Sequence, residues 1–182
     1  TGGTYGWSID EDTELVNLQN SILNGEVVTR EPAYYAGGTA AAHSGQDWGN
    51  TYAEVDMSAQ HMWYVQNGQV VLETDVVTGE PIPSKITPEG VYSLMWKQPN
   101  SVLVGDINPD TGEPAYRTKV KYWMQVTSSG VGFHDATWQT AFGGTLYQIP
   151  GTGSHGCINM PLDQAGALFN MIEPGTPVIF HW

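Results

Sequence analysis

The sequence has little cysteine, few basic residues and no long apolar run. Its 182 residues include one cysteine, Cys157, which excludes an intrachain disulfide and leaves a free thiol. Six Lys and Arg stand against 19 Asp and Glu, for a formal charge of −13. Because DNA, RNA and anionic membrane surfaces are bound through basic patches, we expect none of them as a partner. No stretch approaches the ~18 consecutive apolar residues of a membrane-spanning helix.

The composition predicts a mainly β chain in which a small helical segment comes first. Gly (22 residues), Thr, Val, Tyr and Trp are plentiful, whereas helix formers are sparse. Residues 30–50 are rich in Gly and Ala without hydrophobic periodicity, which predicts a linker or extended arm. We therefore expect a domain boundary after residue 49, with residues 50–182 as the main domain. The chain begins at Thr1 with neither Met nor a signal-like segment, so we expect a piece of a longer protein.

Local signals predict the individual elements. Asp10 as N-cap and Gly25 as stop enclose apolar residues at spacings of three and four, which predicts an amphipathic helix. Asn67-Gly68 lies between two apolar segments and predicts a β-hairpin. Strands are predicted at 51–58, 60–66, 69–77, 87–97, 120–127 and 130–136, a polar loop at 104–119, a helix at 161–172 and a strand within 173–182. The strand tryptophans Trp63, Trp96 and Trp123 are predicted to lie in the core.

Cys157 stands in the stretch GSHGCINM, flanked by glycines and close to a histidine. A thiol with its ordinary pKa of about 8.5 is only a few per cent thiolate at neutral pH, and an imidazolium can lower that pKa by several units. His155 is two residues away, but only His134 is free to approach from a separate strand. Gly153 and Gly156 allow backbone N–H groups to approach a reacting carbonyl. The alternative is a buried structural cysteine and an ordinary strand-end histidine.

These residues resemble a known motif. His134, a gap of about twenty residues and then Ser-His-Gly-Cys-Ile-Asn at 154–159 closely resemble the catalytic motif of L,D-transpeptidases, the YkuD-type domain of bacterial cell-wall enzymes. The stretches SAQHMWYVQNGQVVLETDVVTG and VVTGEPIPSKITPEGVY are similar to the opening hairpin of that family and to the segment that follows it. The resemblance covers residues 50–182. Residues 1–49, with GGTYGW and REPAYY, resemble the end of the wall-associated domain that precedes this domain in some Gram-positive members.

The resemblance implies a fold and a set of roles. The fold is a β-sandwich of mixed sheets with a short helix after the catalytic cysteine. Cys157 is the implied nucleophile and His134 the base. Ser154 and His155 shape the pocket, the N–H groups of Gly156 and Cys157 are oxyanion donors, and Asp135 orients or polarises the site. No cofactor or metal is implied, and we expect a monomer.

The implied reaction joins peptidoglycan stem peptides. The cysteine attacks the carbonyl between the third residue of a tetrapeptide stem and its terminal D-Ala, which leaves, and an acceptor amine then forms a 3→3 cross-link. Carbapenem-type β-lactams are the expected inhibitors. The substrate implies a location outside the membrane, in a parent protein that is secreted or anchored. An L,D-carboxypeptidase and a non-catalytic wall-binding module remain alternatives, whereas a papain-like protease would place Cys before His.

Further residues are candidates for substrate binding. Tyr116, Trp138 and Tyr147 are hypotheses for pocket contacts, and Asn159 stands where many family members carry Arg, so donor recognition is expected to differ. The stretch DINPDTG at 106–112 has the alternate spacing of a calcium loop, but Gly and the final Glu are misplaced. We therefore predict a polar hairpin loop there.

Overall fold

The computed structural model describes residues 3–5, 9–30, 32–33 and 48–182. It contains two compact units, one made of Thr1–Thr4 and Asn50–Trp182 and the other of Tyr5–Gly49. The stretches GGTYGW and REPAYY lie in part outside the described residues. Within those residues, no helix has both the length and the apolar composition to cross a membrane.

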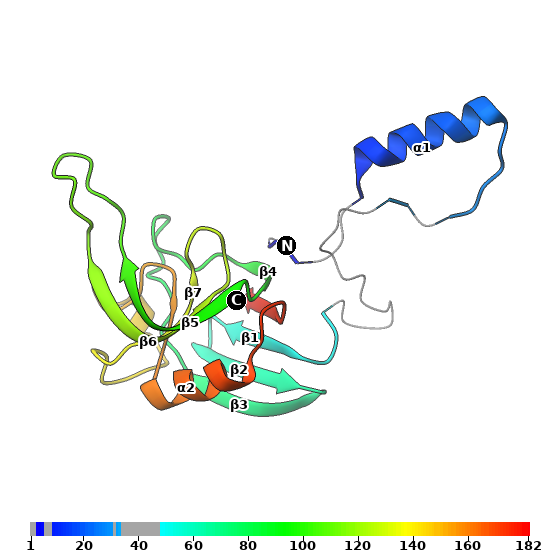
Figure 1. Ribbon diagram of the computed structural model, residues 1–182. Coiled ribbons are helices and arrows are strands. Elements are labelled where there is room, and N and C mark those ends of the chain that lie inside the picture. Colours follow the sequence, from blue (N-terminus) through cyan, green and yellow to red (C-terminus); the bar gives the residue numbers. More distant parts are fainter. Residues whose placement is uncertain (1–2, 6–8, 31, 34–47) are drawn as a thin grey trace. The chain divides into compact units, whose positions relative to one another are not determined.

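The smaller unit contains the predicted helix, α1 (Glu11–Asn24) (Figure 1). The Asp10 carboxylate accepts the N–H of Thr13, and Gly25 ends the helix with a left-handed φ of 66°. Arg30, on the chain that follows, donates to both carboxylate oxygens of Glu14 at 2.7 and 2.8 Å. The N-cap and the stop are therefore confirmed, and the helix has no buried residue within this unit.

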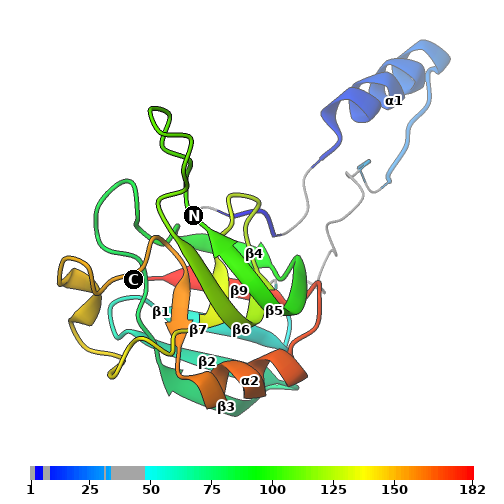
Figure 2. The ribbon, with the colours of Figure 1, turned by 60° about the vertical axis from the view of Figure 1, so that its left-hand side comes forward.

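The larger unit consists of two mixed β-sheets (Figure 1, Figure 2). The first has the order β3-β2-β1-β9-β4 and contains β1 (Tyr52–Asp56), β2 (His61–Gln66), β3 (Gln69–Asp75), β4 (Gly90–Ser93) and β9 (Pro177–His181). The second has the order β5-β6-β7-β8 and contains β5 (Trp96–Val104), β6 (Arg117–Gln125), β7 (Gly132–Asp135) and β8 (Ile158–Met160). Each sheet holds one parallel pair, β1 with β9 and β7 with β8. The predicted mainly β fold of mixed sheets is confirmed.

The core lies between the sheets and is closed by α2 (Leu162–Met171), the predicted helix after the cysteine. Met62 and Phe180 from the first sheet meet Phe133 and Ile158 from the second, all fully or almost fully buried. The helix packs against β6, β7 and β3 (Figure 2). A short 3-10 helix, Leu146–Gln148, lies in the connection from β7 to β8. That connection brings the cysteine-bearing turn back beside His134, on the strand next to β8.

Three strand predictions differ from the structure. The single strand predicted at 87–97 is two strands, β4 and β5, which belong to different sheets. β5 also continues past the predicted end at Lys97 to Val104, the first residue of the predicted loop. Pro99 does not interrupt it, because β5 is an edge strand and needs no N–H at that position. The three-residue β8, directly after Cys157, was not predicted because so short a run carries no periodicity.

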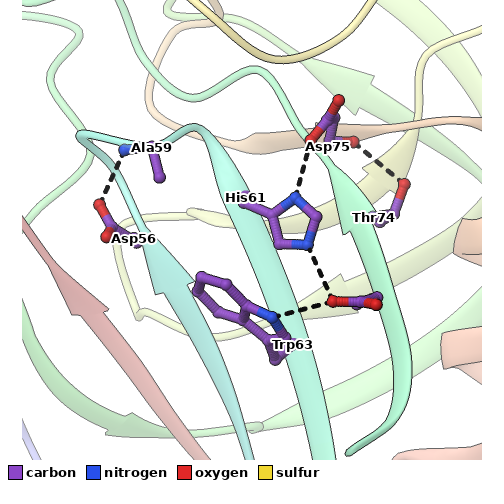
Figure 3. A network of polar contacts seen from close by, with 7 residues as sticks. Asp56, Ala59, His61, Trp63, Thr74 and Asp75 are labelled. Carbon is purple, nitrogen blue, oxygen red and sulfur yellow. Dashed lines mark hydrogen bonds and ion pairs between the residues drawn. The ribbon is translucent and has the colours of Figure 1, made fainter.

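The tryptophan prediction holds only for Trp123, which is 4% exposed. Trp96 is 40% exposed, and Trp63 lies on the outer face of β2, where its indole N–H donates to Glu73 at 3.1 Å (Figure 3). His61 is tilted against Trp63 and makes a 2.7 Å contact with Asp75. The prediction failed because alternation identifies the two faces of a strand and does not tell which one is buried.

Candidate active site

Cys157 ends a tight turn that Ser154 closes. The Ser154 hydroxyl donates to the Cys157 carbonyl at 2.5 Å and accepts the Gly156 N–H at 2.9 Å. Gly156 has a φ of 118°, a value that residues with side chains rarely adopt. The two hydrogen bonds and the glycine at 156 therefore stabilise this turn, which leads directly into β8.

His134 lies on β7, next to β8, and is 4% exposed. Its Nδ1 is 3.0 Å from the carbonyl oxygen of Asp135. Since a carbonyl only accepts hydrogen bonds, Nδ1 carries the proton of the neutral ring and Nε2 has a free lone pair. The ring lies between Trp123 and Trp138, at centroid distances of 6.1 and 5.8 Å, so its plane is constrained from both sides.

The two residues share a cavity of about 480 Å³. Its lining includes seven of the predicted site residues: Tyr116, His134, Trp138, Ser154, His155, Cys157 and Asn159. A second cleft, bounded by Trp96, Val102, Val104 and Trp123, reaches the same cysteine. Leu103, Tyr116 and Cys157 line both. Cys157 is therefore approached from two directions.

The electrostatics favour a neutral pair. Burial raises the pKa of the Cys157 thiol to about 11, although a hydrogen bond from the Gly132 backbone offsets part of this. Burial also lowers the pKa of His134, against the opposing effects of the hydrogen bond to the Asp135 backbone and of the Asp135 charge. The expected lowering of the thiol pKa by an imidazolium is not found in the resting site, because burial disfavours the thiolate and the imidazolium alike.

The other three predicted site residues, all within the described part of the chain, do not line the cavity. Asp135 is buried, and its carboxylate accepts the N–H groups of Lys121 and Tyr122 at 2.7 and 2.8 Å, which fixes β6 against β7. Tyr147 is buried with its ring 6.2 Å from that of Trp182. Gly156 acts through its backbone conformation, and its N–H already donates to Ser154. Asp135 therefore holds β6 and β7 together, and Tyr147 does not reach the cavity. An oxyanion would have to compete with the Ser154 hydroxyl for the Gly156 N–H.

Asn159 and Tyr116 are held by neighbours that the sequence did not point to. The Asn159 amide donates to Gln139 Oε1 at 2.6 Å, and Gln139 itself lines the cavity. The Tyr116 ring lies 5.0 Å from that of His155 and directly over Gly105, where a Cβ would be 2.6 Å from the ring. Position 105 therefore has to be glycine for Tyr116 to take this place beside the cavity.

The segment from Thr78 to Thr87 is hydrogen-bonded to the cysteine turn, and the sequence did not predict these contacts. The Glu80 N–H donates to the Ser154 carbonyl at 3.0 Å, and its carboxylate accepts the N–H of Gly151 and the Lys85 ammonium, both at 2.9 Å. The hydrogen bond from Lys85 is the main reason that the pKa of Glu80 is lowered. The signal in the sequence was a polar Gly-Glu-Pro turn far from the cysteine, which gave no indication of this contact.

A cysteine and a histidine that share a cavity are the two groups that acyl transfer through a thiol requires, a nucleophile and a base. Residues 50–180 match the family model of the L,D-transpeptidase catalytic domain, YkuD, and the chain belongs to this family. It therefore carries an L,D-transpeptidase catalytic domain, of the acyltransferase class.

Known proteins extend the comparison. A mutant of Enterococcus faecium L,D-transpeptidase with Cys replaced by Ser aligns at a TM-score of 0.79 and 42% identity, over 98% of this chain and 67% of that one. The E. faecium catalytic domain acylated by ertapenem aligns at 0.61 and 46% identity, over 72% and 97%. L,D-transpeptidase 1 of Mycobacterium tuberculosis is 30% identical over 67% of this chain and 47% of its own length. The chain thus spans between a third and a half of the curated relatives it matches.

Proposed function

We propose that this domain forms 3→3 cross-links between peptidoglycan stem peptides, with Cys157 as nucleophile and His134 as base. The observation that carries the proposal is the shared cavity, in which the histidine keeps its Nε2 lone pair free because Nδ1 is bonded to the Asp135 carbonyl. Ser154 supports the role of Cys157, because its hydroxyl fixes the turn from both sides of the cysteine.

In the first step the neutral thiol attacks the carbonyl between the third residue of a tetrapeptide stem and its terminal D-Ala. The thiol proton passes to His134 Nε2 as the S–C bond forms, and the imidazolium returns it to the leaving amine as the C–N bond breaks. D-Ala departs and a thioester remains. In the second step an acceptor amine attacks the thioester, gives its proton to His134, and displaces the Cys157 sulfur, which regains a proton.

The two clefts support a reaction with two peptide substrates. Because Cys157 lines both, we assign one cleft to the donor peptide and the other to the acceptor amine. Trp138, 52% exposed at the cavity edge, and Tyr116, shared by both clefts, are our candidates for peptide contacts. Asn159, held by Gln139, is our candidate for an amide contact to the donor.

We assign residues 50–182 to the catalytic domain and residues 1–49 to the end of a preceding wall-associated domain and a linker. Because cell-wall peptidoglycan lies outside the membrane, we place the parent protein there, secreted or anchored. The ertapenem-acylated relative supports carbapenems as covalent ligands of Cys157 in this chain.

The test is an assay with a tetrapeptide donor and a stem-peptide amine acceptor, read by mass spectrometry of the products. The expected product is the cross-linked dimer with release of D-Ala, and it is absent with Cys157→Ala. A tripeptide as sole product would instead identify an L,D-carboxypeptidase. Unchanged donor would contradict both enzymatic functions and favour a wall-binding module.

A further inference from the structure

The peptide group that joins Gly156 to Cys157 accepts a hydrogen bond from a residue far away in the sequence. Thr87, 2% exposed, donates its hydroxyl hydrogen to the Gly156 carbonyl at 2.8 Å. The same hydroxyl accepts the N–H of Gly79 at 3.0 Å. The Thr87 hydroxyl therefore uses its donor on the cysteine turn and an acceptor on its own segment, at Gly79.

The geometry of this peptide fixes the direction of the Cys157 N–H. The described chain contains no cis peptide bond, and in a trans peptide the C=O and the N–H point in opposite directions. Thr87 holds the Gly156 oxygen on one side, so the Cys157 N–H points to the other. Cys157 lines both clefts, whereas the buried Thr87 lines neither. The Cys157 N–H thus points away from Thr87 and its buried surroundings.

The other nearby N–H of the turn is already engaged. Gly156 donates to the Ser154 hydroxyl, which leaves the Cys157 N–H as the better placed donor for a developing oxyanion. A hydrogen bond accepted by the carbonyl of a peptide polarises that peptide and strengthens its N–H as a donor. Thr87 therefore acts on both the direction and the strength of this donor.

We propose that Thr87 is a positioning residue for acyl transfer, which holds the Gly156–Cys157 peptide so that the Cys157 N–H stabilises the oxyanion. This inference rests on the proposed function, because an oxyanion forms only if Cys157 attacks a carbonyl. The segment lies close to the cysteine turn at Gly79, where a Cβ would lie 2.9 Å from Gly156 Cα and 1.9 Å from the Lys85 carbonyl oxygen. The segment has no room to compensate for a lost hydroxyl by moving closer.

Two reactions of the same sulfur separate positioning from general damage. Acylation by imipenem passes through an oxyanion, whereas alkylation by iodoacetamide needs the thiol but no oxyanion donor. We expect Thr87→Val to lower the acylation rate constant by about 10- to 100-fold, since misplacing an oxyanion donor costs somewhat less than removing it. Alkylation should stay within about twofold of wild type, and Thr87→Ser should restore most of the acylation rate.

The matched control is Thr51→Val. Thr51 is half-buried at the start of the first sheet, away from the cysteine turn, and its hydroxyl accepts the N–H of Asn67 at 3.0 Å. We expect this variant to lose thermal stability while keeping the wild-type ratio of acylation to alkylation. The inference is overturned if Thr87→Val acylates at the wild-type rate, if both reactions slow equally, or if Thr87→Ser gives no rescue. A wild-type protein that imipenem does not acylate would instead overturn the proposed function, and the inference with it.

Discussion

Cys157 and His134 line one cavity, in which the thiol lies 3.6 Å from the Gly130 carbonyl oxygen and the imidazole keeps Nε2 without a proton. With a thiol pKa of about 11, the sulfur is almost fully protonated at neutral pH. Under the proposed function, activation depends on proton transfer during the attack, for which the Nε2 lone pair of His134 is suited.

This pairing predicts the pH dependence of acylation. Burial lowers the pKa of His134 below its usual 6.5, so its neutral, basic form persists to lower pH than that of an ordinary imidazole. We expect the imipenem acylation rate to fall as this base is protonated, with its half-maximal value below pH 6.5. Stopped-flow measurements across pH 5 to 8 check this, and a half-maximal rate at or above pH 6.5 would contradict it.

The turn that carries the cysteine is held by the segment Thr78 to Thr87 as well as by its own strand. β8 is only three residues long, whereas the segment contributes the Glu80 backbone and carboxylate and the Thr87 hydroxyl. Gly153 shows how close this contact is, because a Cβ there would be 2.7 Å from Glu80 Cγ. The segment therefore acts as the support of the nucleophile turn.

Glu80→Gln tests the charge in this support. The lowered pKa of Glu80 gives the folded state stability that is present above about pH 4.5 and lost as pH falls through the folded value. We expect Tm at pH 7 to fall by about 2–4 °C, because the pairing with Lys85 is lost while the chain remains able to accept the Gly151 N–H. The difference from wild type should shrink below pH 4.5. A deficit that stays constant with pH would show that the charge is not responsible.

Local elements were predictable from the sequence and long-range contacts were not. The cap at Asp10 and the turn at Asn67-Gly68 are written in adjacent residues, and both elements form where predicted. The candidate site was found through the run of residues 154–159 and the spacing to His134. The supports at Glu80 and Thr87 were missed because each contacts a backbone group about 70 residues away, and hydrogen bonds of this kind leave no periodic pattern.

The charge of the chain bears on the proposed substrate recognition. A formal charge of −13 repels anionic wall polymers, so under the proposed function local contacts in the clefts have to supply the affinity for stem peptides. We expect kcat/KM for a tetrapeptide donor to change by less than about threefold between 50 and 300 mM NaCl, because long-range attraction is not part of binding. A steep fall of kcat/KM with added salt would contradict this.

The most direct test of the Cys157–His134 site is the intact mass of the protein after incubation with imipenem. We expect one adduct with the full mass of imipenem on the wild type, because opening of the lactam ring loses no atoms. The adduct should be absent in Cys157→Ala, and it should form at least about 100-fold more slowly in His134→Gln, which lacks the base. An adduct that persists in Cys157→Ala, or wild-type protein that remains unmodified, would contradict the assignment of Cys157 as the nucleophile.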